Sequence, residues 1–399
     1  MNKEQIKKYL RLAIIVVLSM IIGSIITIFI KDDKSTNINA NIIRNNKDHS
    51  EFESLYEAYD TIMKEYYQEV DSKTLIDGAL SGMMDSLGDK HTTYFNKSEK
   101  EEFDTELSGT YYGIGAQIQL ISENNVKIVK IFDDSPAEKA GLKVGDIFVS
   151  IDGKSTDGMD ASDVANKLRS KEASKATIIV NRNGEEKKFE VKKANVTMFS
   201  VSSEMLNANN KNIGYINVSI FGEKTYYQFY DALIKLEKND MDSLIIDLRG
   251  NTGGYLSTVT NMLNLFVGNK KVLYQIQTNE GTTEYKSSTT SNRKYKIILL
   301  VDGQSASASE IMAAAMKEDY DAILVGKNTY GKGTVQTTKD LSNNTMIKYT
   351  IEKWLTPSGK NIDGEGIAPD YEIDLPEEYS NNPTKENDAQ LQKAIELLK

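Results

Sequence analysis

Short apolar runs of strand length alternate with helical stretches across residues 196–375, and this alternation restricts the fold more than any other feature of the chain. The runs are Ile213–Ser219, Ser243–Leu248, Lys271–Ile276, Lys296–Val301 and Ala322–Val325, and the helical stretches lie at about 224–239, 255–266 and 309–318. Strands that alternate with helices are typical of an α/β core with a largely buried sheet. We therefore expect residues 196–375 to form one α/β domain.

Side chains that bind transition metals are scarce. Cysteine is absent, which excludes disulfides and thiolate metal sites. The two histidines are His49, in a polar stretch, and His91. A histidine-rich zinc site is therefore excluded, and a Ser-His-Asp triad would have to use His91. We expect neither a metal nor a cofactor.

The N-terminus carries an uncharged apolar run from Leu12 to Ile30, 19 residues long. At about 1.5 Å per residue, a helix of this length nearly spans the hydrocarbon core of a bilayer. Four basic residues and one acidic residue precede the run, and two of each sign follow it. This asymmetry predicts a single-pass cell-membrane anchor with a cytoplasmic N-terminus and an extracytoplasmic remainder. A cleaved signal peptide is the alternative, although no Ala-x-Ala site follows closely.

The net charge argues against nucleic acid as a partner. Residues 1–31 contain five basic residues and one acidic residue, which leaves −14 for the rest of a chain whose formal net charge is −10. An acidic exterior portion repels phosphate backbones.

Changes in composition divide the chain into six parts. They are an anchor (1–31), a polar linker (32–50), a helical segment (51–107), a first folded module (108–195), the α/β domain (196–375) and a C-terminal helical tail (376–399). Apolar residues at helical spacing predict two helices in the segment 51–107, the second ending near Gly88. The tail helix, about Asp388–Leu398, has an apolar face that can join subunits or pack within the chain.

The module at 108–195 resembles a PDZ domain. Tyr112, Gly113, Ile114 and Gly115 are similar to the carboxylate-binding loop of such domains, because glycines let successive backbone N–H groups converge on one point. A substrate tail can then add to the following strand as an extra β-strand. An ordinary tight turn is the alternative for the glycines alone. The strand, the typical helix–turn–strand block and the groove helix are expected at Ala116–Leu120, Ser135–Asp146 and Asp163–Leu168.

A serine at a predicted helix start is the candidate nucleophile. Ser307 follows a strand-like run and a turn of small residues, so its hydroxyl is presented at the positive end of a helix. Ser307 and Glu310 also fit a capping box, and this structural role is compatible with the catalytic one.

A lysine between two glycines is the candidate base. Burial of Lys332 would disfavour its charged form and lower its pKa, which lets it take a proton from a serine. The sequence of residues 326–332 is also similar to that of a phosphate-binding loop. However, Gly333 occupies the position at which that loop has a Ser or Thr that binds Mg²⁺. Thr334–Thr338 moreover predicts a strand, whereas that loop requires a helix.

These two segments resemble the carboxyl-terminal processing peptidases, which are serine peptidases with a Ser–Lys dyad. The resemblance covers about residues 50–399 and implies a crotonase-like β-β-α spiral for the α/β domain. It implies Ser307 as nucleophile, Lys332 as base and Gln336 as the residue that orients the lysine. The segment Trp354–Asp370 matches the family's closing segment and is expected to brace the site. His91 is expected to be structural.

The resemblance also assigns an oxyanion hole. The turn Asp247–Gly254 joins a buried strand to a helix, and a glycine N–H here would act with the N–H of Ala308. Gly253 is the predicted donor and Gly254 the alternative. A purely structural turn remains possible. Asp247 and Arg249 are expected to pair without a catalytic role.

The sequence thus predicts a multidomain protein of mixed α/β and α+β class, in all a membrane-anchored bacterial serine endopeptidase that recognises free C-terminal tails. Family resemblance implies a homodimer. A membrane-tethered PDZ scaffold without catalysis is the alternative function. The presence of both candidate catalytic residues, Ser307 and Lys332, favours the peptidase over the scaffold.

Overall fold

The computed structural model describes residues 50–122, 125–132, 134–169, 174–208, 210–291 and 293–398. The chain divides into two compact units, Met1–Leu80 and Ser81–Lys399. The predicted anchor at Leu12–Ile30 lies outside the described residues. Within the described ranges, none of the helices combines the length and apolarity needed to cross a bilayer.

The described part of the first unit is helical. Helix α2 spans Ser50–Glu65, and α3 begins at Ser72 and ends at Asp85 in the second unit. Both helices were predicted from apolar spacing, and Gly88 follows with a φ of 64°. On α2, the apolar side chains Phe52, Leu55 and Tyr56 are exposed.

A short connector leads from α3 into the PDZ-like module. It consists of strand β1 (Thr93–Phe95) and helix α4 (Lys97–Ser108). Asn96 begins α4 with a capping box, and Gly109 ends it in the left-handed conformation that glycine favours.

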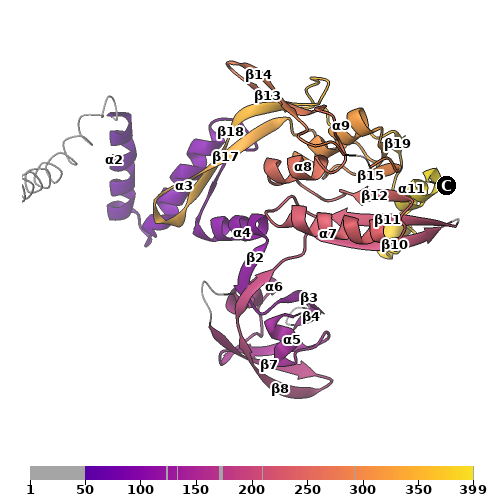
Figure 1. The fold of residues 1–399 in the computed structure, drawn as a ribbon. Helices are drawn as coiled ribbons and strands as arrows, with labels where there is room; N and C mark the ends of the chain where they lie inside the picture. Colours follow the sequence, from indigo (N-terminus) through magenta and orange to yellow (C-terminus); the bar gives the residue numbers. More distant parts are fainter. Residues whose placement is uncertain are drawn as a thin grey trace, which may run out of the picture. The chain divides into compact units, whose positions relative to one another are not determined.

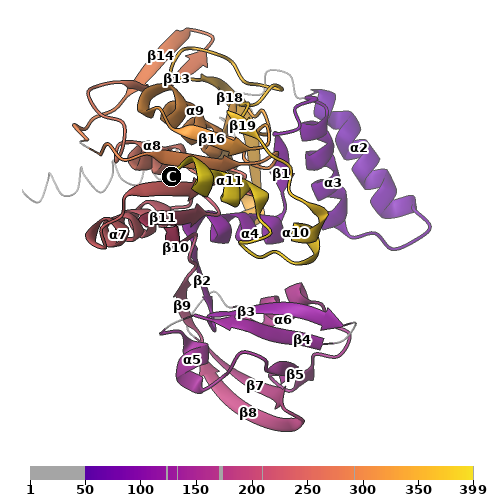
Figure 2. The ribbon, with the colours of Figure 1, turned by 90° about the vertical axis from the view of Figure 1, so that its right-hand side faces the viewer.

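The PDZ-like module has its own sheet and core. Its strands are β2 (Thr110–Gly113), β3 (Ala116–Ser122), β4 (Asn125–Ile131), β5 (Ile147–Ile151), β6 (Lys154–Ser155), β7 (Lys175–Arg182), β8 (Glu185–Lys192) and β9 (Ala194–Thr197). Strands β3-β4-β5-β7-β8 form the sheet, with β6 beside β5, and β2 pairs with β9. Helices α5 (Pro136–Ala140) and α6 (Ala161–Leu168) complete the module, and α6 contacts the edge strand β3 (Figure 2).

The α/β domain is built on a six-stranded sheet. The order is β10 (Val201–Ala208), β11 (Lys211–Val218), β12 (Ser243–Asp247), β15 (Ile297–Val301), β16 (Ile323–Gly326) and β19 (Tyr371–Glu372). Only β10 is antiparallel to its neighbour. Every residue of β12 and β15 is buried, which fits the continuous apolar runs in the sequence.

Three helices connect these strands, as the alternation in the sequence predicted. They are α7 (Thr225–Lys238), α8 (Leu256–Leu263) and α9 (Ala308–Tyr320), with α8 and α9 close to one another (Figure 1). Phe229, Leu233, Val259 and Met312 pack into one core with one face of the sheet. The opposite face packs against α11 (Ala389–Leu397) through Leu391. Intramolecular packing is therefore the role of the tail helix here.

A second sheet lies beside the first and was not evident in the sequence. Its order is β1, β18 (Met346–Leu355), β13 (Val272–Thr278) and β14 (Gly281–Lys286), with β17 (Thr334–Asp340) on the other side of β18. The predicted strand Lys271–Ile276 is thus real, but it belongs to this sheet. The strand β17 follows Lys332, so the helix that a phosphate-binding loop requires is absent there. Two short elements, η1 (Ser342–Asn344) and α10 (Glu377–Asn381), complete the fold.

Arg249 fastens the C-terminal segment to the end of β12. Its guanidinium lies 2.6 Å from Asp247 Oδ2 and 2.8 Å from Asp388 Oδ2, and all three side chains are nearly buried. The predicted Asp247–Arg249 pair therefore forms, and it extends to a residue 139 positions away.

We expect Arg249→Met to lower the free energy of unfolding by about 3–5 kcal/mol, because it leaves two buried carboxylates without a counterion. Urea denaturation followed by the fluorescence of the single tryptophan, Trp354, measures the change. Lys327→Met is the matched control, since Lys327 also bridges two carboxylates but at the surface, where ion pairs contribute little. Equal midpoints for the two variants would contradict this account.

Candidate active site

The candidate site lies where three neighbouring parallel strands end. The turn containing Gly253 follows β12, Ser307 follows β15, and Lys332 follows β16. The carboxyl ends of adjacent parallel strands meet at one edge of a sheet, which is the usual place for ligands in such folds. The topology therefore brings together residues that are separated by 79 positions in the sequence.

Ser307 begins α9 in a strained backbone conformation. Its φ of 55° and ψ of −114° lie where residues with a side chain are rare. Hydrogen bonds hold the turn around it: Ser305 Oγ donates to Leu248 O at 2.8 Å, and Ala306 N donates to Asn251 O at 3.0 Å. The turn therefore fixes the half-buried serine at the positive end of the helix.

The loop of Lys332 is braced by the segment Trp354–Asp370, which begins at the end of β18. Trp354 Nε1 donates to Lys332 O at 2.7 Å, and Gly364 N donates to Gly331 O at 2.9 Å. A Cβ at Gly331 would lie 2.9 Å from Gly366 N, so the glycine before the lysine allows this close approach. The closing segment thus braces the lysine loop, as expected.

The surroundings of Lys332 favour its neutral form. Burial lowers its pKa to about 8, and the positive charge of Lys348 acts in the same direction, against Asp89 and Glu310. Lys348 Nζ lies 5.2 Å and 5.5 Å from the ring centres of Phe95 and Phe103. Burial lowers the pKa of Lys348 as well.

Glu310 joins the serine turn to the lysine loop. Its fully buried Oε2 accepts hydrogen bonds from the backbone N–H groups of both Ser307 and Lys332, each at 2.9 Å. Because the backbone nitrogens of Ser307 and Lys332 are both 2.9 Å from the same oxygen, the two backbones are held close to one another. Lys332 Nζ is not hydrogen-bonded to Ser307 Oγ among the described contacts of this structure.

Gln336 lies on β17 and contacts threonines instead of Lys332. Its Nε2 donates to Thr334 Oγ1 at 2.8 Å and to Thr350 Oγ1 at 3.2 Å. Thr350 Oγ1 in turn donates to Asp89 Oδ2 at 2.6 Å. Burial opposes ionisation of Asp89, but hydrogen bonds from Thr350, Thr92 and the His91 N–H lower its pKa to about 2. A charged carboxylate therefore anchors the side chain predicted to orient the lysine.

The two predicted oxyanion donors are adjacent. A Cβ at Gly253 would lie 3.2 Å from Ala308 N and 2.9 Å from Ser307 Cβ, so only glycine fits beside the serine turn. The Gly253 N–H donates to Asn251 Oδ1 at 2.9 Å in this structure. Within the described residues, the Ala308 N–H has no protein partner, as is usual for the first turn of a helix.

His91 lies near Lys332 rather than deep in the core. Burial and the charge of Lys332 lower its pKa, and its ring centre is 6.2 Å from that of Tyr330. Its Nε2 is buried without a hydrogen-bond partner among the described residues. Metal binding has no support in the described ranges, which contain no cluster of three or more His, Asp or Glu side chains suited to an ion.

The predicted tail-binding residues lie at the start of the edge strand of the PDZ-like module. Tyr112 and Gly113 end β2, and Ile114 and Gly115 form the turn into β3. A φ of 76° at Gly115 and its contact with Ser135 require glycine there. The outer edge of β3 is unpaired within its sheet, so it can accept an added strand beside α6.

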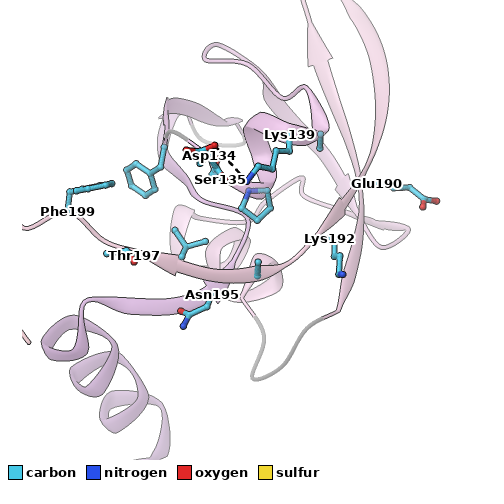
Figure 3. Close-up of a pocket in the computed structure, with 13 residues that line it drawn as sticks. Asp134, Ser135, Lys139, Glu190, Lys192, Asn195, Thr197 and Phe199 are labelled. Carbon is cyan, nitrogen blue, oxygen red and sulfur yellow. Dashed lines mark hydrogen bonds and ion pairs between the residues drawn. The ribbon is translucent and has the colours of Figure 1, made fainter. Parts of the chain in front are cut away.

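A cavity of about 710 Å³ lies in the same module, between α5 and the segment β8–β9 (Figure 3). Lys139, Lys192, Thr197 and Phe199 are among the residues that line it. The cavity contains neither Ser307 nor the tail-binding turn, so we do not place the reaction there.

Sequence reasoning missed three contributors to the site. Glu310 was interpreted only as a helix cap. Its position directly before the apolar run of α9 was a signal that its carboxylate could be buried. Asn251 is fully buried and links the Gly253 turn to the serine turn. Asp89 contacts Gln336 through Thr350, although the two residues are 247 positions apart in the sequence. No local pattern in the sequence shows such a contact.

Comparisons with known proteins agree with this architecture. The model of peptidase family S41 matches residues 212–373, a PDZ domain model matches 128–182, and the N-terminal domain of the activating protease CtpB matches 21–99. The structure described as an S41 protease from Bacteroides fragilis shares the fold, with a TM-score of 0.51 at 15% identity over 85% of this chain and 96% of that one.

Curated relatives extend over nearly the whole chain. The carboxy-terminal processing protease CtpA of Bacillus subtilis is 36% identical over 379 residues, which cover 94% of this chain and 80% of that protein. CtpB of the same organism is 37% identical over 334 residues, covering 83% of this chain and 69% of the relative. The chain therefore belongs to peptidase family S41, as a carboxy-terminal processing serine protease with a PDZ domain.

Proposed function

We propose that the protein cleaves peptide bonds with Ser307 as nucleophile and Lys332 as base. The observation that carries the proposal is that one buried carboxylate oxygen accepts the N–H groups of both residues. This contact supports the proposal because it links the backbone of a strained serine to that of a lysine whose pKa burial lowers to about 8. An ordinary surface lysine would be almost fully protonated near neutral pH and could not serve as a base.

The reaction follows from these groups. Neutral Lys332 Nζ takes the proton of Ser307 Oγ, and Oγ attacks the scissile carbonyl to form a tetrahedral oxyanion. Collapse of this species gives an acyl-enzyme, while Lys332 returns the proton to the departing amine. The lysine then takes a proton from water, whose oxygen attacks the acyl-enzyme, and gives that proton to Ser307 Oγ as the ester bond breaks and the new carboxylate is released. Gln336 is the residue proposed to orient the lysine; in this structure it contacts Thr334 and Thr350, and Asp89 holds Thr350.

Backbone N–H groups stabilise the oxyanion in this scheme. The Ala308 N–H is available at the start of α9, and the Gly253 N–H joins it when it leaves Asn251 Oδ1. A preorganised donor of this kind contributes about 3–4 kcal/mol to transition-state stabilisation.

The PDZ module selects substrates by their free C-terminal tails. The proposed tail adds to the edge of β3, with its carboxylate at the turn Gly113–Gly115. The segment Leu12–Ile30 anchors the protein in the cell membrane, with the catalytic region outside the cytoplasm. Exposed apolar side chains on α2, such as Leu55 and Met63, suit a homodimer.

Two substrates that differ only at the C-terminus test tail recognition. We expect efficient cleavage of a protein with a free apolar tail and at least about tenfold slower cleavage of the same protein with an amidated tail, since the amide removes the charge that the N–H groups bind. Peptide products are separated by mass spectrometry. Equal rates would refute selection by the carboxylate, whereas binding of the tail without any cleavage would support a scaffold.

A further inference from the structure

We propose that Glu310 is a positioning residue that sets the separation between Ser307 and Lys332. The inference rests on the proposed Ser–Lys mechanism and assigns a function to a side chain that sequence reasoning treated as a helix cap. Glu310 touches no reacting atom, so it acts through the backbone of the two dyad residues.

The contacts of Glu310 exceed what a cap requires. A capping glutamate needs one hydrogen bond, to the N–H of the N-cap residue. The carboxylate of Glu310 accepts four: Oε2 from the N–H groups of Ser307 and Lys332, both at 2.9 Å, and Oε1 from the Gly331 N–H at 2.7 Å and Thr329 Oγ1 at 2.6 Å. Three of these four donors belong to the lysine loop and not to α9, the helix that contains Glu310.

Burial makes the arrangement rigid. Glu310 is fully buried, and neighbouring α9 residues Ile311, Met312 and Ala313 are buried too. Hydrogen bonds to a charged acceptor are stronger than those between neutral groups, and a buried acceptor left without donors is strongly destabilising. The lysine loop therefore cannot move away from the serine turn without breaking contacts with the carboxylate.

The negative charge has a second consequence. Glu310 favours the charged form of Lys332, in opposition to burial and Lys348. The same side chain therefore fixes the position of the base and limits how far its pKa falls. A purely structural carboxylate would affect folding but leave the pH dependence of the reaction unchanged.

Two variants separate position from charge. Glu310→Asp keeps the charge but shortens the reach to the lysine loop, so we expect the plateau rate to fall about 100-fold with little movement of the pH midpoint. Glu310→Gln keeps the length but removes the charge, so we expect the midpoint of the acid limb to move to lower pH. The readout is the second-order rate of labelling by a fluorophosphonate, measured on the full chain from pH 6 to 10.

Asp388→Asn is the matched control, because Asp388 is also a nearly buried carboxylate with several donors, but it contacts Arg249 and the start of α11. Its plateau and midpoint should equal those of the wild type. Folding of every variant is checked by its urea midpoint. Wild-type plateau and midpoint in both folded Glu310 variants would overturn the inference about Glu310. Absence of labelling in the wild type would instead contradict the proposed function.

Discussion

Replacing Ser307 with alanine is expected to abolish peptide cleavage, with a loss of at least about 10⁴-fold in kcat/KM. The substitution removes the only atom that attacks the carbonyl. Stability should fall by no more than about 1 kcal/mol, because Ser307 is the N-cap of α9 and this is the usual cost of replacing an N-cap serine with alanine. Cleavage of a tailed protein is followed by mass spectrometry, and urea denaturation checks the fold. Undiminished hydrolysis by a folded Ser307→Ala protein would exclude this serine as nucleophile.

Replacing Lys332 with methionine is expected to lower kcat/KM by about 10³-fold, because a general base contributes about 10²–10⁴-fold. The wild-type rate should rise with pH through about 8, where Lys332 loses its proton. At pH 7 about a tenth of such lysines are neutral, against about one in 3,000 with an ordinary pKa. The remaining activity of Lys332→Met should lack this rise.

Lys348→Met is a control that keeps Lys332 but changes its pKa. The positive charge of Lys348 lowers the pKa of Lys332, so its removal should move the midpoint of the pH–rate profile upward. The profile is measured with one tailed substrate at concentrations far below KM. A wild-type rate that is constant between pH 6 and 10 would contradict a lysine base.

The α/β domain was predictable because its strands and helices carry different apolar periods. Continuous apolar runs predicted β12 and β15, and both are buried along their whole length. Strand β18 escaped notice because its mixed pattern of burial reflects pairing with β1, β13 and β17, and two of these lie far away in the sequence. Assignment of a strand to one sheet or another depends on such contacts.

The candidate site residues could be proposed from the sequence where a local pattern indicates the chemistry. A small-residue turn before a helix indicated Ser307, and two flanking glycines indicated Lys332. The contribution of Glu310 depends on the two loops meeting at the sheet edge, and the sequence does not contain that distance. The same holds for Asp89, which reaches Gln336 through Thr350. The hydrogen bond from Gly253 to Asn251 was equally invisible, because it depends on the backbone conformation of the turn.

The most direct test of the central claim is mass spectrometry of the protein after reaction with a fluorophosphonate at pH 9. We expect one covalent adduct, on the peptide that contains Ser307, and very slow formation of that adduct in Lys332→Met. An adduct on another residue, or equal labelling rates in the wild type and Lys332→Met, would contradict a Ser307–Lys332 dyad.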